Sequence, residues 1–161
     1  MNQIMRCFVL SFLCLALAGC GLDETTHRSD KPLSLEAAIK DVWISSVTFP
    51  SSAKDIYYFY HSGGLQEYEF VVRFTVDPKD LDGAVSNLLS DHDKTTKENH
   101  TYIFASIANA PRPSIFSEFP PMPWWNPNSI TNGYYRGGTN GQPFDIWIDA
   151  AKHTVYLSQT D

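Results

Sequence analysis

The chain has 161 residues and carries 12 basic and 18 acidic side chains, for a formal net charge of −6. This length suits one domain with one core, and the acidic balance argues against nucleic acid as a partner and against a domain lying on anionic lipid. Aromatic residues make up 14% of the chain, which is its main compositional peculiarity.

Residues 1–19 have the pattern of a secretory signal. Arg6 precedes an apolar run from Phe8 to Ala16, and small residues follow before Cys20. The run is shorter than the ~20 residues that a transmembrane helix needs, so a signal peptide is favoured over a membrane span. The four residues Leu17-Ala18-Gly19-Cys20 resemble the lipobox of bacterial lipoproteins.

This resemblance implies a location. In that class the signal is cut before Cys20, and the cysteine carries a thioether-linked diacylglycerol whose acyl chains together hold the protein firmly to a membrane. Gly21 is not the aspartate that usually retains such proteins at the inner membrane. The resemblance therefore implies an exported protein anchored to the cell envelope through Cys20, at the outer membrane and facing the periplasm if the organism is Gram-negative.

The cysteine count agrees with this reading. Cys7 and Cys14 lie in the segment that would be removed, so the exported chain keeps Cys20 alone and forms no internal disulfide. The polar residues that follow Cys20 predict a flexible tether over residues 20–32, and a stretch of a dozen residues reaches at most ~40 Å. A single globular domain is then expected over residues 33–161.

Two amphipathic helices are predicted in this domain. The first begins at the N-cap Ser34 and runs to about Trp43, and the second follows the N-cap Asp77 with Pro78 at its first position. The expected buried faces are Leu35, Ala38, Ile39 and Val42 in the first helix, and Leu81, Val85, Leu88 and Leu89 in the second. Residues 90–100 should form a solvated loop.

Two β-prone runs flank Gly63-Gly64 and predict a hairpin with a two-residue turn. This register puts Phe59 opposite Tyr68, and opposed residues share one face of a sheet. The expected core side chains are Tyr57, Phe59, Tyr68, Phe70, Val72 and Phe74. Tyr58 and Tyr60 would fall on the other face, either exposed or covered by a later loop.

Three further segments follow the second helix. Residues 101–108 are either a short strand or a buried turn. Residues 109–133 hold six of the ten prolines but are rich in large aromatic side chains, so we expect an ordered loop pinned over the sheet. Alternation over residues 144–149 and a β-prone run from Thr154 predict a second hairpin.

The expected fold is therefore α+β. A mostly antiparallel sheet of four to five strands, built from two hairpins, should carry two helices packed on one face.

No catalytic motif is recognisable, so we expect no enzymatic activity and no cofactor. A metal site from Asp91, His92, Asp93 and His100 lacks a compact ligand spacing, and a solvated loop without metal is the favoured reading. Acidic pairs such as Glu67 with Glu69, or Asp145 with Asp149, could serve a glycan hydrolase but more often only keep a surface soluble.

Aromatic side chains are the one functional lead. Trp124, Trp125, Tyr134 and Tyr135 form the candidate binding surface. Tryptophan and tyrosine anchor protein interfaces, stack on sugars, or simply fill a core. The favoured function is a non-catalytic lipoprotein that binds or helps assemble an envelope protein, with a toxin-blocking lipoprotein as a special case. The alternative is a glycan-binding module or weak glycan hydrolase that uses the loop 111–136.

Overall fold

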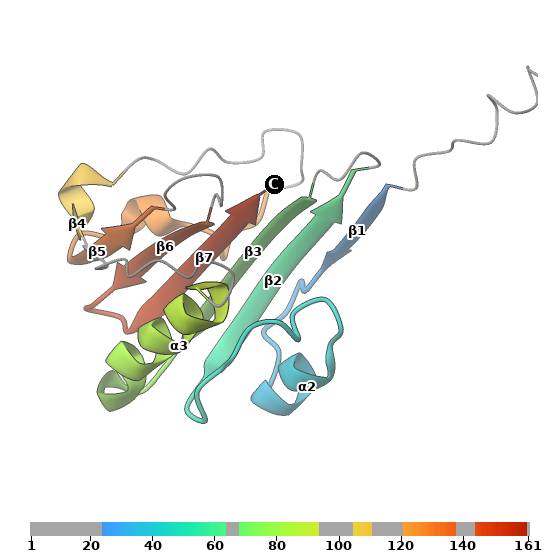
Figure 1. Ribbon diagram of the computed structural model, residues 1–161, viewed down its shortest axis with the longest axis horizontal. Coiled ribbons are helices and arrows are strands. Elements are labelled where there is room, and N and C mark those ends of the chain that lie inside the picture. The colour runs from blue at the N-terminus through green and yellow to red at the C-terminus, as the bar shows by residue number, and fades with distance from the viewer. Residues whose placement is uncertain (1–23, 64–67, 94–104, 111–120, 138–143, 161) are drawn as a thin grey trace, which may run out of the picture.

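An antiparallel β-sheet of seven strands forms the centre of the computed structural model (Figure 1), which describes residues 24–63, 68–93, 105–110, 121–137 and 144–160. The strand order is β1-β2-β3-β7-β6-β5-β4. The strands are β1 (Thr25–Arg28), β2 (Lys54–Ser62), β3 (Tyr68–Thr75), β4 (Ala105–Ser106), β5 (Gly133–Arg136), β6 (Phe144–Asp149) and β7 (Thr154–Thr160). The α+β class is confirmed, but four to five strands were too few because β1 and β5 were not predicted.

Two meanders meet in the middle of the sheet. β1, β2 and β3 form the first meander, and β4 to β7 form the second. β3 pairs with β7 from Glu69 opposite Thr160 to Thr75 opposite Thr154. Both predicted hairpins, β2–β3 and β6–β7, are therefore present, and the two meet side by side.

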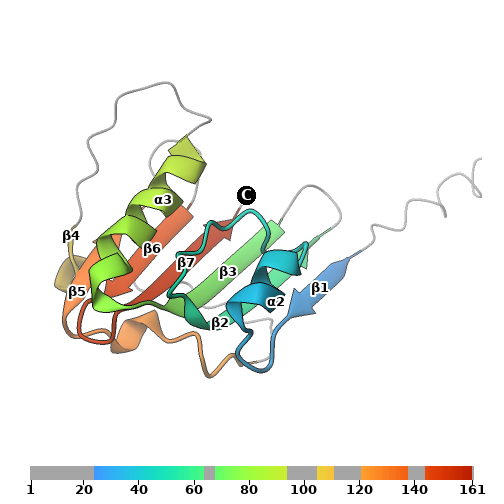
Figure 2. The ribbon, with the colours of Figure 1, turned by 90° about the horizontal axis from the view of Figure 1, so that it is seen from below.

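Two α-helices lie on the same face of the sheet, as predicted (Figure 2). The first, α2 (Leu35–Lys40), begins where expected because the Ser34 hydroxyl accepts the Ala37 N–H at 3.2 Å. It ends earlier than expected and packs through Ala38. Ile39 and Val42, predicted to be buried, are 60% and 75% exposed.

The second helix begins with a short 3₁₀ turn, η1 (Pro78–Asp80), which leads into α3 (Leu81–Asp93). Val85, Leu88 and Leu89 are buried against the sheet, so the predicted apolar stripe is confirmed. The helix extends to Asp93, although a loop was expected from residue 90 onward.

The register of the first hairpin was predicted wrongly. Ser62 pairs with Tyr68, so the connection is longer than two residues, and Phe59 lies opposite Val71 rather than Tyr68. An odd shift in register moves every side chain of one strand to the other face of the sheet. Tyr58 and Tyr60 therefore pack on the face that carries α2 and α3, while Tyr57 and Phe59 lie on the opposite face.

Both faces of the sheet are covered. On the helix face, α2 and α3 cover an aliphatic and aromatic core whose sheet members include Ile56, Phe70, Val72, Phe74, Ile146 and Leu157. On the other face, which we call the loop face, Phe59, Val71, Trp147 and Tyr156 pack against Trp125 and Ile130. The predicted ordered loop over the sheet is thus confirmed for the described residues 121–130, whereas residues 111–120 lie outside the described part.

Strand β1 corrects the expected extent of the tether. Thr25 pairs with Ser62 and Arg28 with Phe59, so the folded domain begins within the segment 20–32 that was expected to be flexible. The sequence Thr-Thr-His-Arg lacks alternating apolar residues, so no strand was predicted there. Residues 1–23, including the lipobox and Cys20, lie outside the described residues.

Candidate functional site

An aromatic cluster fills the loop face of the sheet. Trp125 is 5% exposed, and its ring meets Trp147 and Tyr156 edge-on, with centroid separations of 5.9 and 5.6 Å. Edge-to-face contacts of this kind add to the stabilisation gained from burial alone. Trp125 is therefore a core residue, which agrees with the interpretation that some of these aromatic side chains fill a core.

Trp124 lies at the half-buried end of this cluster. Its ring stacks on Tyr57 at 5.4 Å with the two planes 16° apart, and it meets Trp125 edge-on at 6.1 Å. The guanidinium carbon of Arg73 lies 5.6 Å from the centre of the Tyr57 ring, within cation–π range. We call Tyr57, Arg73 and Trp124 the Trp124 surface.

The neighbouring tyrosines, Tyr134 and Tyr135, point to opposite faces because β5 alternates. Tyr135 faces Trp147, with ring centroids 5.5 Å apart, and its hydroxyl donates to Asp145 Oδ1 at 2.8 Å. Burial raises the pKa of Tyr135 above its ordinary value, and the hydrogen bond to Asp145 and the negative charge of Asp145 raise it further. Tyr134 is 52% exposed beside α3 on the helix face.

The structure thus brings three of the four predicted residues together, namely Trp124, Trp125 and Tyr135. Tyr134 does not belong to this cluster. Sequence reasoning missed Tyr57 and Arg73 as members of the site, because their place on the loop face depends on the register of β2 with β3. A connection with an odd number of residues, such as the five between Ser62 and Tyr68, would have predicted it.

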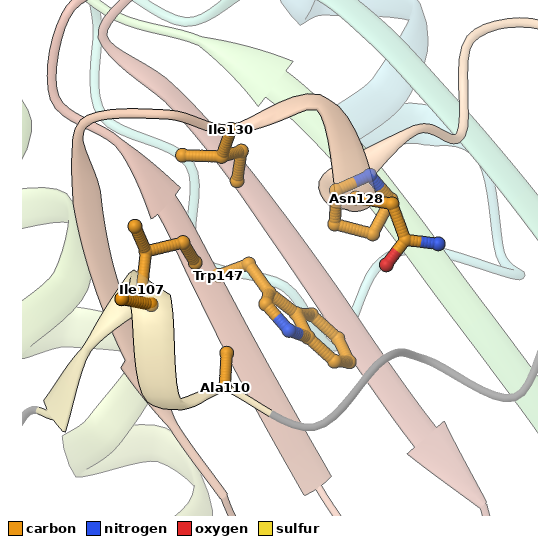
Figure 3. Close-up of a pocket in the computed structure, with 7 residues that line it drawn as sticks. Ile107, Ala110, Asn128, Ile130 and Trp147 are labelled. Atoms are coloured by element: carbon orange, nitrogen blue, oxygen red, sulfur yellow. The ribbon is translucent and has the colours of Figure 1, made fainter.

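A pocket of about 370 Å³ lies beside the cluster (Figure 3). Trp147 lies between Ile107 and Ala110 on one side and Asn128 on the other. The lining residues are Ile107, Ala108, Ala110, Pro127, Asn128, Ile130 and Trp147. None of these side chains is charged, so the pocket suits an uncharged group.

Two buried donors of the cluster are unsatisfied. Trp125 Nε1 and Trp147 Nε1 are shielded from solvent and have no hydrogen-bond partner within the structure as described. Each buried N–H left unpaired costs about 1–3 kcal/mol. The loop face is therefore less well satisfied than a purely structural aromatic core would be.

The carboxylates flanking Trp147 have structural partners. Asp149 is buried, and its Oδ1 accepts the backbone N–H groups of Ala151 and Lys152 at 3.1 and 3.0 Å, which fixes the β6–β7 turn. Asp145 accepts the Tyr135 hydroxyl. These two carboxylates hold the fold together, and this weakens the reading of the pair as a hydrolase site; Glu67, from the other acidic pair, lies outside the described residues.

The possible metal ligands Asp91, His92, Asp93 and His100 have side chains that lie outside the described part of the chain. Elsewhere, over the ranges that the structure does describe, no three His, Cys, Asp or Glu side chains gather as a metal site would require. Over those same ranges, no helix has the length and apolar character needed to cross a membrane.

Comparisons with family models, with curated proteins and with solved structures give no match to this chain.

Proposed function

We propose that this protein is a lipid-anchored envelope protein without catalytic activity, which binds a protein partner through the Trp124 surface. The lipobox resemblance at Cys20 supports the anchor. The Trp124 surface supports the binding role.

Two features of the Trp124 surface carry the proposal, namely the types of residue that form it and the buried side chains on which it rests. Tryptophan, tyrosine and arginine are the residue types most enriched at the energetic centres of protein interfaces, and here one of each lies in a continuous stack. Trp124 and Tyr57 are half-buried, and Trp125 beneath them is fixed by Trp147 and Tyr156. A rigid aromatic surface of this kind loses little conformational entropy when a partner binds.

A glycan-binding module is the second candidate, and the pocket at Trp147 supports it. The uncharged lining and the Asn128 amide, which both donates and accepts hydrogen bonds, would match a neutral sugar. Against it, one ring face of Trp124 is already covered by Tyr57, and Trp125 is buried, so little aromatic face remains for stacking on a sugar.

The binding role can be tested by crosslinked pull-down of the full-length lipidated protein from its own envelope. Trp124→Ala should lose specific proteins that the wild type captures. Tyr134→Ala is the matched control, because it removes an exposed aromatic side chain from the opposite face. Circular dichroism would show that both variants are folded.

If Trp124→Ala captures the same proteins as the control, the Trp124 surface is not the binding site. If folded wild type recovers glycan, and Asn128→Ala loses it, the second candidate replaces the first.

The anchor is tested by Cys20→Ala. This variant should leave the membrane fraction or remain uncleaved, since the thioether cannot form. Partitioning with membranes identical to that of the wild-type protein would contradict the lipobox interpretation.

A further inference from the structure

We propose that β1 is a releasable part of the membrane tether, so that the domain has a docked position close to the bilayer and an extended position farther away. This inference rests on the proposed lipidation of Cys20. It concerns the four residues of β1 and the contacts that hold them against β2.

In the docked position, polar and ring contacts hold β1. The Thr26 hydroxyl and His61 Nδ1 share a hydrogen bond of 2.9 Å, and His61 Nε2 lies 3.5 Å from Glu24 Oε1. The ring of His27 stacks on Trp43 with centroids 3.9 Å apart. These contacts fix the register of β1 along the outer edge of β2.

These contacts are weaker than those of the central strands. No side chain of β1 is buried, since Thr25 and His27 are half-buried and Thr26 and Arg28 are exposed. By contrast, Val71 and Val72 of β3 are fully buried, between β2 and β7. Surface polar contacts contribute little net stability, and edge elements with few buried apolar groups open before the rest of a domain.

The release should stop at Ser29, which is buried and bonded to β2. Its N–H donates to the Tyr58 carbonyl at 3.0 Å, and its hydroxyl accepts the Tyr58 N–H at 2.9 Å. Leu33 continues this attachment by donating its N–H to the Ile56 carbonyl at 2.8 Å. Ser29 is therefore the hinge between the releasable strand and the fixed domain.

The two positions differ in reach. From Cys20 to Thr25 an extended chain covers at most about 18 Å, whereas from Cys20 to Ser29 it covers at most about 32 Å. Release of β1 would thus nearly double the longest distance between the lipid and the first fixed residue.

The ladder geometry supplies a matched pair of proline variants. Because Ser29 and Tyr58 are a hydrogen-bonded pair, His27 and Tyr60, two residues along, are a hydrogen-bonded pair as well. Proline at position 27 removes a bond of the ladder, whereas the N–H of Thr26 points away from β2, and an edge strand tolerates proline there. Each substitution also removes one side-chain contact of β1, the Thr26–His61 bond or the His27–Trp43 stack, so the two variants differ in the ladder bond. His27→Pro should release β1, and Thr26→Pro is its control.

A third variant holds β1 in place. Thr26 and His61 form a non-hydrogen-bonded pair, in which the Cα atoms of antiparallel strands come closest. The double substitution Thr26→Cys/His61→Cys should therefore form a disulfide that locks the docked position.

The test uses full-length lipidated protein in phosphatidylcholine vesicles that contain a headgroup-labelled acceptor lipid. A donor dye on Ala151→Cys reports the height of the β6–β7 turn, which lies at the end of the sheet away from Thr25. His27→Pro should lose energy transfer relative to Thr26→Pro, and the locked variant should keep the highest transfer of the set.

In unmodified protein, hydrogen exchange gives an independent measurement. The backbone amide of His27 should exchange with solvent faster than the backbone amide of Val72.

The outcomes separate the two proposals. Protein that fails to bind the vesicles overturns the lipid anchor and this inference together. Anchored protein in which His27→Pro and Thr26→Pro give equal transfer overturns only the releasable strand. If His27→Pro does not fold, the exchange rates decide, because equal exchange at His27 and Val72 means that β1 opens only with the whole domain.

Discussion

The two faces of the sheet are covered in different ways. The helix face is covered by α2 and α3, and its core is rich in Ile, Val, Leu and Phe side chains. The loop face is covered by the irregular segment 121–130 with the turn Ile107–Asn109, and its core is dominated by Trp, Tyr and Phe rings. Large aromatic side chains thus allow a proline-rich segment without helical periodicity to act as a covering layer.

The difference extends to polar groups. On the helix face the hydroxyl of Tyr58 donates to Asp41 Oδ2 at 2.9 Å. On the loop face two indole N–H groups are buried without a partner in the described structure, and a pocket adjoins one of them. Over the described residues, buried unsatisfied donors and open volume thus coincide on the loop face, and both are features typical of binding sites.

The largest expected effect comes from truncating one buried ring on each face. Phe74→Ala and Trp125→Ala should each lower the free energy of unfolding by about 3–5 kcal/mol, because both leave a large cavity. Urea denaturation followed by circular dichroism measures this. A loss below about 1 kcal/mol for Trp125→Ala would show that the loop layer is not part of the cooperative core.

A smaller effect distinguishes satisfied from unsatisfied polar groups. Tyr58→Phe removes a hydroxyl bonded to a carboxylate and should cost about 1.5–3 kcal/mol. Trp147→Phe, by contrast, removes an unpaired N–H, which offsets part of the packing lost with the smaller ring, so the net change should be within about 1 kcal/mol. The same denaturation assay compares them, and an equal or larger loss for Trp147→Phe would contradict the assignment of an unsatisfied donor.

The third prediction is a pH dependence that appears only in alkaline solution, and it concerns the two tyrosine–aspartate pairs, one on each face. Burial raises the pKa of Tyr58 to about 12, with smaller contributions from its hydrogen bond to Asp41 and from the negative charge of Asp41. The same three causes raise the pKa of Tyr135 beside Asp145. Unfolded tyrosines titrate near pH 10, so above that pH the folded state binds more protons than the unfolded state. The free energy of unfolding should then fall as the pH rises from about 10 to 12.

Tyr58→Phe and Tyr135→Phe should each flatten this alkaline loss, and neither should change the pH dependence below about pH 9. Denaturation midpoints across the alkaline range measure the slope. Tyrosine absorbance in which every phenol titrates near pH 10 would contradict the raised pKa values.

Sequence reasoning succeeded where apolar periodicity was clear. The apolar stripe predicted Val85, Leu88 and Leu89 as the buried face of α3, and the alternation over residues 144–149 predicted a strand, and the structure has both. It failed for β2 because residues 56–60 are apolar or aromatic at every position, so either face could be the buried one. Only the length of the connection to β3 decides between them.

The candidate site was predictable in part. Trp124 and Trp125 were predicted as part of the candidate binding surface, because a proline-rich segment with large aromatic side chains is seldom disordered. Tyr57 and Arg73 complete the Trp124 surface only through the pairing of β2 with β3. Such long-range pairing leaves no local pattern, and the polar strand β1 went unrecognised for lack of any apolar pattern.

The central pairing of β3 with β7 has a consequence for how the chain reaches this fold. β3 is made early and β7 late, with Phe74 opposite Val155, so the sheet has a high contact order and should form slowly. Until β7 arrives, the first meander exposes an unpaired edge that carries Val71 and Val72, a hazard for aggregation. A chain that is made N-terminus first would therefore need this edge shielded, for example by a chaperone, until β7 is free to pair.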